Sequence, residues 1–221
     1  YTAKKAGVSR EDQDRFALAS HQKAVAAMEA CRFKAETVAT LIEKDESPRK
    51  DSSLEALAAL KPSFEKDGTV TPGNAPGLND GASALVVTSL AFAKAHGVKP
   101  LARVTAYGSA GGEPRDLFFA PIVAVQNLMA KARMKIGDYD LIEANEAFAV
   151  QAIADGRALG WDWDRVNVNG GAIALGHPIG ASGARILTTL LFALKDRKQT
   201  TGLATLCLGG GNAVALSVEM L

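Results

Sequence analysis

From residue 101 to its end, the chain alternates short apolar runs with longer helical patterns. Strands are predicted over 102–107 and 140–144, with a helix over 122–132 between them and another over 147–159. Strands that alternate with helices form a sheet covered by helices, because each helix must bury its apolar stripe. Residues 101–221 are therefore predicted to form a layered α/β domain.

The end of the chain has the pattern of a β-hairpin. Two β-rich runs, 203–208 and 213–220, flank the sequence Gly-Gly-Gly-Asn at 209–212, which favours a tight turn. A helix is predicted over 181–195, directly after a glycine-rich loop at 167–180. The hairpin would place its turn immediately after a cysteine.

The residues ahead of 101 are less regular. Ser9 is a good helix N-cap with Asp12 three residues on, so a helix is predicted from there to residue 30. The other predicted elements are a charged surface loop over 43–54, a short helix over 53–60, an irregular segment over 69–80, a buried strand over 81–89 and a helix over 90–96.

Composition excludes several classes of function. Lys and Arg total 25 against 24 Asp and Glu, with no basic stripe, so nothing indicates a nucleic-acid or membrane-surface partner. No apolar run approaches the ~20 residues of a membrane span. Cys31 and Cys207 are too few for a disulfide framework and suggest a reducing compartment. His21, His96 and His177 lack the spacing of a zinc site.

Two segments carry residues suited to chemistry: the predicted strand-to-helix junction at 143–149 and the glycine-rich stretch at 167–185. Asn145 follows a predicted strand, where it either caps the next helix or displays a reactive amide at the strand end. His177 stands between Gly176 and Pro178 in a stretch with five glycines, at 170, 171, 176, 180 and 183. A packing histidine would not require that much backbone freedom, so His177 is interpreted as functional.

Cys207 ends a predicted strand just ahead of three glycines. Free cysteines are usually buried and inert, but this setting places a thiol beside exposed backbone N–H groups, as an oxyanion hole requires. Cys31 sits at a polar helix end without such surroundings and is interpreted as incidental.

Several segments, in this order, resemble those of the thiolases. Asn-Glu-Ala-Phe-Ala at 145–149, the glycine-rich run at 170–185 and Cys-Leu-Gly-Gly-Gly at 207–211 resemble the three C-terminal motifs of that family. Gly-Thr-Val-Thr at 68–71 and Gly-Leu-Asn-Asp-Gly-Ala at 77–82 also resemble family segments. The resemblance runs along essentially the whole chain.

The resemblance implies the thiolase fold, a layered α/β/α/β/α arrangement, of which this chain is expected to hold the C-terminal half plus a remnant of the loop domain. Residues 1–75 are expected to be that remnant, and 76–100 the last strand and helix of the N-terminal thiolase domain. Residues 101–221 are expected to be the C-terminal thiolase domain.

The resemblance also implies an activity and roles. Thiolases join two acetyl-CoA in a Claisen condensation to acetoacetyl-CoA plus CoA, or cleave 3-ketoacyl-CoA by thiolysis. By resemblance, Cys207 is the general acid/base, a role that suits a thiol titrating near neutrality. His177 activates the nucleophilic cysteine and helps bind the thioester oxygen. Asn145 holds a water that helps stabilise the enolate, and the Gly209 N–H contributes to an oxyanion hole.

Substrate-binding residues follow from the same resemblance. Ala75, Pro76 and Gly77 resemble the loop against which the pantetheine arm of CoA lies, although some thiolases have Ser in place of Pro76. Phe148 either packs beside the acyl chain or belongs to the core. Leu117 begins a stretch bulkier than the family's, which either reshapes the acyl pocket or fills core. The CoA thioester is the substrate, and no cofactor or metal is implied.

The family's nucleophilic cysteine, in its Cys-Gly-Ser/Ala-Gly context, is absent from this sequence. Ping-pong acyl transfer needs a nucleophile and a separate base, so neither Cys31 nor Cys207 can replace it. The N-terminal thiolase half is expected to be missing and the fragment to be inactive alone. The loop over 37–52 is shorter than in the family.

The remaining expectations are a homodimer or homotetramer in fatty acid metabolism, cytoplasmic, with a mitochondrial location open because the chain starts without Met. A non-catalytic thiolase-fold subunit that binds CoA or an active partner is the main alternative. A β-ketoacyl synthase fits less well, because such enzymes use a second histidine in place of Cys207 and lack Asn-Glu-Ala-Phe.

Overall fold

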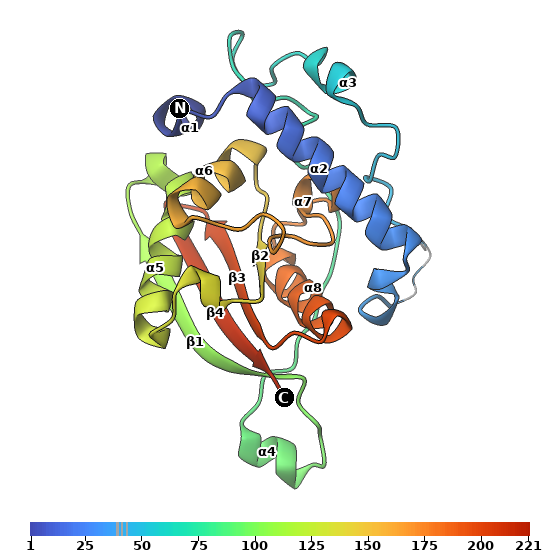
Figure 1. Ribbon diagram of the computed structural model, residues 1–221, viewed down its shortest axis with the longest axis vertical. Helices are drawn as coiled ribbons and strands as arrows, with labels where there is room; N and C mark the ends of the chain where they lie inside the picture. Colours follow the sequence, from blue (N-terminus) through green and yellow to red (C-terminus); the bar gives the residue numbers. More distant parts are fainter. Residues whose placement is uncertain (39, 41, 43) are drawn as a thin grey trace.

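A four-stranded mixed sheet forms the centre of the protein, in the strand order β1-β4-β3-β2 (Figure 1). The computed structural model describes residues 1–38, 40, 42 and 44–221. The strands are β1 (Ala102–Gly111), β2 (Leu141–Ala144), β3 (Thr201–Leu208) and β4 (Asn212–Met220). β2 runs parallel to β3, and the other two pairings are antiparallel. The fold class is therefore α/β, as predicted.

Helices cover both faces of this sheet (Figure 1). The principal helices of this part are α5 (Ala120–Ala132), α6 (Ala149–Leu159) and α8 (Ser182–Arg197). Side chains alternate along β3, so Leu203 packs on the face covered by α5, and Ala204 on the face covered by α8. Gly108 of β1 lies so close to α5 that an added Cβ would be 2.3 Å from the Ala124 carbonyl oxygen.

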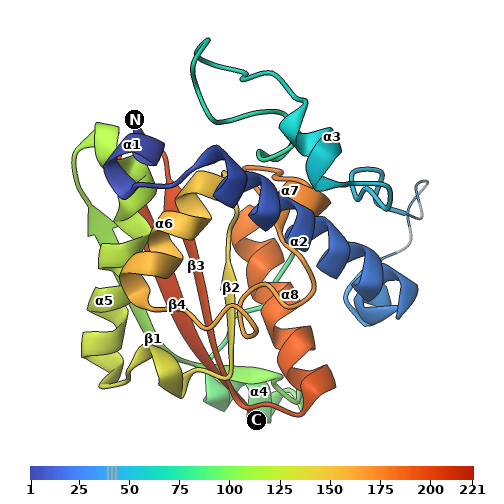
Figure 2. The ribbon, with the colours of Figure 1, turned by 45° about the horizontal axis from the view of Figure 1, so that its top comes forward.

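The N-terminal part of the chain reaches both ends of the sheet: its first three helices wrap over one end, and its fourth lies at the opposite end, near the C-terminus (Figure 2). Its α-helices are α1 (Thr2–Ala6), α2 (Arg10–Glu29), α3 (Leu54–Ala58) and α4 (Leu90–Ala95), and it also holds the short helix η1 (Arg32–Ala35). The short helices in the rest of the chain are η2 (Pro114–Phe119), η3 (Ile136–Asp138) and α7 (Ala172–Leu175). α2 packs against α6 and α7. Among the described residues, none of these helices is both long and apolar enough to cross a bilayer.

Most predicted elements are confirmed, with bounds shifted by a few residues. Ser9 and Asp12 form a reciprocal capping box at the start of α2, and the Ser53 hydroxyl accepts from the Ala56 backbone N–H at the start of α3. The hairpin of β3 and β4 turns through three glycines, with φ +79° at Gly210 and +89° at Gly211. Part of the predicted 43–54 loop lies outside the described residues, which do not include 39, 41 and 43.

The strand predicted over 81–89 is wrong. The segment is irregular and mostly exposed, with Val86 94% and Val87 81% exposed. A strand needs a neighbouring strand for its backbone groups, and this segment pairs with none of β1 to β4. The segment has a β-like apolar pattern, but the described residues offer it no sheet to join.

Candidate active site

The site lies where the two parallel strands end. Ala144 of β2 pairs with Thr205 of β3, and the Asn145 backbone N–H continues the ladder by donating to the Thr205 carbonyl at 2.9 Å. Asn145 and Cys207 therefore emerge at the same edge of the sheet, at the carboxyl ends of adjacent strands. Open α/β sheets commonly bind ligands at this edge.

Backbone and side-chain contacts hold the His177 loop in place. Gly176 has φ +98°, and a Cβ there would meet the Asn79 side chain at 2.5 Å. The Asn79 Oδ1 accepts from the His177 backbone N–H at 3.2 Å. The loop needs glycine at 176 for both its backbone conformation and this close approach. Asn79, which was given no role from the sequence alone, is the residue whose close approach leaves no room for a side chain at 176.

Both ring nitrogens of His177 have defined partners. The Ser182 hydroxyl lies 2.6 Å from Nδ1 and donates its own proton to the Pro178 carbonyl at 3.0 Å. When the hydroxyl gives its one proton to that carbonyl, Nδ1 carries the N–H toward Ser182. Nε2 then presents a lone pair, which faces the Asn145 Nδ2 at 3.3 Å. The structure thus brings Asn145 and His177 together at the end of β2.

Electrostatics keep this imidazole neutral. Burial lowers the pKa of His177 below its usual value, and the positive charge of Arg185 lowers it further. The half-buried ring therefore has an uncharged Nε2 lone pair available at neutral pH. Such a nitrogen can take a proton from a neighbouring donor and afterwards return it as an N–H.

Cys207 is half-buried near the end of β3. Burial raises the pKa of its thiol to about 11, and the negative charge of Asp155 contributes to the rise. The expectation of a thiol titrating near neutrality is therefore wrong for this structure, because the described residues set no cation beside it. Gly209, two residues on, is exposed at the turn, and its carbonyl accepts from the Asn212 Nδ2 at 3.0 Å.

Glu146, whose role was not predicted from the sequence, is a buried carboxylate that holds three segments around the site together. Its side chain is 1% exposed and accepts from the Ser20 hydroxyl, the Asn167 Nδ2 and the Ile173 backbone N–H at 2.7, 2.8 and 3.1 Å. These bonds join α2, the glycine-rich loop and α7 to the end of β2. A Cβ at Gly171 would lie 2.2 Å from this carboxylate, which explains that glycine.

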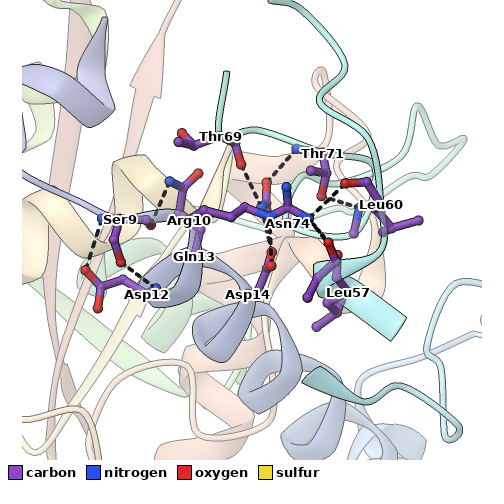
Figure 3. A network of polar contacts seen from close by, with 12 residues as sticks. Ser9, Arg10, Asp12, Gln13, Asp14, Leu57, Leu60, Thr69, Thr71 and Asn74 are labelled. Atoms are coloured by element: carbon purple, nitrogen blue, oxygen red, sulfur yellow. Dashed lines mark hydrogen bonds and ion pairs between the residues drawn. The ribbon is translucent and has the colours of Figure 1, made fainter. Parts of the chain in front are cut away.

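The predicted pantetheine loop is tied to the site through Asn74 (Figure 3). The Asn74 Nδ2 donates to the Asp14 carboxylate at 2.9 Å and to the Thr69 carbonyl at 3.1 Å, while its Oδ1 accepts from the Thr71 N–H at 2.9 Å. The Asn74 carbonyl accepts from the Ala149 N–H at 3.0 Å. The segment Ala75, Pro76 and Gly77 therefore starts beside the first turn of α6.

Three aromatic rings gather at that same turn. Phe148, the N-cap of α6, packs edge-to-face against Phe118 at 5.2 Å and Phe64 at 6.1 Å between ring centroids. Leu117 precedes Phe118 in η2 and is half-buried. The predicted substrate-binding residues therefore cluster around the N-terminus of α6, next to the strand end that carries Asn145.

Family comparison identifies this arrangement. Residues 98–220 match the family model for the thiolase C-terminal domain, and residues 1–91 match the model for the thiolase N-terminal domain. The chain belongs to the thiolase family. The match over 1–91 shows that the chain includes part of the N-terminal domain, which corrects the expectation that this half is missing. The finer division of the chain into domains stays a prediction.

Known relatives are similar along the whole chain. It is 52% identical to the acetyl-CoA acetyltransferase of Escherichia coli and 53% identical to that of Pseudomonas aeruginosa, covering 99% and 98% of this chain. The chain spans 58% of the length of each of these relatives.

Solved structures agree with the fold. The crystal structure of the Bacillus anthracis acetyl-CoA acetyltransferase has a TM-score of 0.95 at 44% identity, over 100% of this chain and 58% of that one. The human mitochondrial 3-ketoacyl-CoA thiolase in complex with CoA has a TM-score of 0.93 at 38% identity, over 100% of this chain and 57% of that one. The thiolase fold is thus established.

Proposed function

We propose that these residues serve thiolase-type acyl transfer, the condensation of two acetyl-CoA to acetoacetyl-CoA plus CoA or the reverse thiolysis. The membership of the thiolase family and the similarity to proteins named acetyl-CoA acetyltransferase support this reaction class. The substrate is a CoA thioester, and the reaction calls on no other cofactor.

The observation that carries the proposal is the pair formed by Asn145 and His177, 3.3 Å apart at the end of β2. In the proposal, the neutral Nε2 of His177 takes the proton of a nucleophilic thiol. The resulting N–H, together with the Asn145 amide, then stabilises the negative charge on the thioester oxygen and on the enolate. Loss of one such donor typically costs 10²–10³ in rate.

Cys207 is assigned the second proton transfer. Its thiol gives its proton to the CoA sulfur that leaves when the nucleophile is acylated. The Cys207 thiolate that remains then removes a proton from the α-carbon of the incoming acetyl-CoA, and the Gly209 N–H binds the acyl oxygen in the second oxyanion hole. Cys31 is exposed at the N-cap of η1, and its backbone forms hydrogen bonds with the backbone of Met28 and Lys34. We therefore assign the acyl-accepting cysteine to residues outside this sequence, and the 221 residues alone are expected to be inactive.

Substitution of the two cysteines tests this assignment in the whole polypeptide that contains these residues. Cys207→Ala is expected to reduce CoA-dependent cleavage of acetoacetyl-CoA by at least ~10²-fold, because the general acid/base is removed. Cys31→Ala is the matched control and should leave the rate unchanged. Full activity in Cys207→Ala would overturn the assignment of Cys207 as the base.

A CoA-binding subunit without activity would give a different pattern. Both cysteine variants and the native protein would then bind CoA while none cleaved acetoacetyl-CoA. Isothermal titration with CoA alongside the activity assay distinguishes that outcome from an enzyme.

A further inference from the structure

Asp155 is a buried acid that the proposed reaction does not use. It lies on α6 and is 0% exposed. Its Oδ2 accepts from the Gln151 Nε2 at 2.5 Å, while its Oδ1 is buried without any partner in the described part of the chain. A charged carboxylate with one neutral donor is poorly compensated in a protein interior, so Asp155 favours the protonated form.

Asp155 faces the same layer of the molecule as Cys207. Along β3, Cys207 shares its face with Leu203 and Thr205, and Leu203 packs in the core on the α5 side of the sheet. α6 lies on this side, next to α5. Leu159, one helical turn after Asp155 on α6, belongs to the same core cluster as Leu203 and as Ala213, which pairs with Cys207. Asp155 and Cys207 therefore lie on the same side of the sheet and face the same apolar layer.

Gln151 links Asp155 to the strand end that carries the site. Its Oε1 accepts from the Ala147 backbone N–H at 3.1 Å, two residues after Asn145. The amide of Gln151 therefore orients Asp155 relative to the residues at the end of β2.

Other charges around this layer are compensated or exposed. On α6 and the helices packed against it, ion pairs join Arg157 with Asp12, Lys5 with Asp116, Arg10 with Asp14, Arg15 with Glu11, and Glu29 with Lys50. Lys23 and Lys131 donate to backbone carbonyls, Arg115 stacks on the Tyr1 ring, and Lys4 is exposed. On the strands, Glu143 faces α8, and Arg103 pairs with Glu219. After burial itself, the negative charge of Asp155 is the next cause that raises the pKa of the Cys207 thiol.

We propose that Asp155 is a positioning residue for Cys207 whose proton controls the thiol. When Asp155 holds its proton, Cys207 can ionise and accept a proton from substrate. When Asp155 releases its proton to solvent, the negative charge left in the same layer opposes ionisation of Cys207. This proposal rests on Cys207 being the base, so its test does not use turnover.

The test compares alkylation of Cys207 by iodoacetamide in the native protein and in Asp155→Asn, over a series of pH values. Alkylation is quantified on the peptide that contains Cys207, so other cysteines do not interfere. The rate follows the thiolate fraction. The ratio of the variant's rate to the native rate is expected to be near one at low pH and to rise to about tenfold above the titration of Asp155, because one like charge is removed.

Two controls accompany the measurement. The Cys31 peptide in the same samples reports an exposed thiol and should show no change. Asp162→Asn removes an exposed acid from the loop after α6 and should match the native protein at Cys207. A rate ratio for Asp155→Asn that is the same at every pH would overturn the proposal, since a purely structural effect is independent of the proton on residue 155. That outcome would leave the proposed role of Cys207 as the base untouched, because the loss of thiolysis in Cys207→Ala tests that role separately.

Discussion

Ser182 shows how one hydroxyl can set the chemistry of a histidine. It is fully buried at the start of α8, accepts from His177 Nδ1 and donates to the Pro178 carbonyl. This arrangement selects the tautomer whose Nε2 faces Asn145. Ser182 belongs to the glycine-rich motif, but only the folded loop shows that its side chain turns back to the ring.

Ser182→Ala is expected to lower the turnover of acetoacetyl-CoA about fivefold, because the loss of one hydrogen bond of about 1 kcal/mol frees the ring and its tautomer. Ser182→Thr retains the hydroxyl and should recover most of the activity. Nitrogen-15 NMR of the imidazole reports the tautomer directly. A single Nδ1–H tautomer that persists in Ser182→Ala would show that Ser182 does not select it.

Glu143 is a buried acid that makes stability depend on pH. Burial raises its pKa from 4.5 to about 8, against the opposing effect of Arg185, whose Nη1 lies 3.6 Å from the carboxylate. Between these two values the folded state holds a proton that the unfolded chain releases. The free energy of unfolding should therefore fall as pH rises from about 4.5 to about 8.

Glu143→Gln should flatten this dependence, retaining stability at pH 8 that the native protein loses, on the order of a few kcal/mol. Urea denaturation at pH 5 and pH 8 measures it. Glu36, whose pKa burial raises to about 7, will leave part of the slope in the variant. If the native protein and Glu143→Gln lose equal stability between the two pH values, Glu143 is not the source.

At the scale of elements, Asn74 joins the irregular 69–77 segment to two helices. Its side chain binds Asp14 of α2 (Figure 3), and its carbonyl accepts from the first N–H of α6. A segment without regular structure can hold one conformation when its buried polar groups are satisfied in this way.

Asn74→Ala is expected to destabilise the protein by about 2–3 kcal/mol, because three side-chain hydrogen bonds in a buried site are lost. Asn127→Ala is the matched control, since Asn127 makes one exposed bond to the Ser109 carbonyl. Urea denaturation compares them. Equal destabilisation by the two substitutions would contradict the anchoring role.

At the scale of the whole molecule, apolar side chains are exposed on the segment before β1 and on β1 itself. The exposed residues there include Val86, Val87, Leu90, Phe92, Val98, Val104 and Tyr107. β1 is also an edge strand of the sheet. Apolar surface beside a free strand edge favours association with other chains.

The 221-residue polypeptide, expressed on its own, is therefore expected to self-associate as its concentration rises. Val86→Lys together with Val87→Glu should weaken this association by placing charges on the patch. Sedimentation velocity over a range of concentrations measures both. A native polypeptide that stays monomeric and melts cooperatively would contradict the prediction.

The sequence by itself determined the elements with strong local signals. The capping box of Ser9 and Asp12, the glycine turn after Cys207 and the α/β alternation each depend on residues close together in the chain. Such signals act through local backbone preferences and periodicity, and the motif order sufficed to indicate the thiolase family.

Only the tertiary structure decided how distant residues act on one another. The β-like run at 81–89 is irregular, because no strand among the described residues pairs with it. Burial raised the pKa of Cys207 well above neutrality, and folding placed Asp155, Glu146 and Asn79 around the site. Desolvation and strand pairing depend on what surrounds a residue in space, and that information is not local in the sequence.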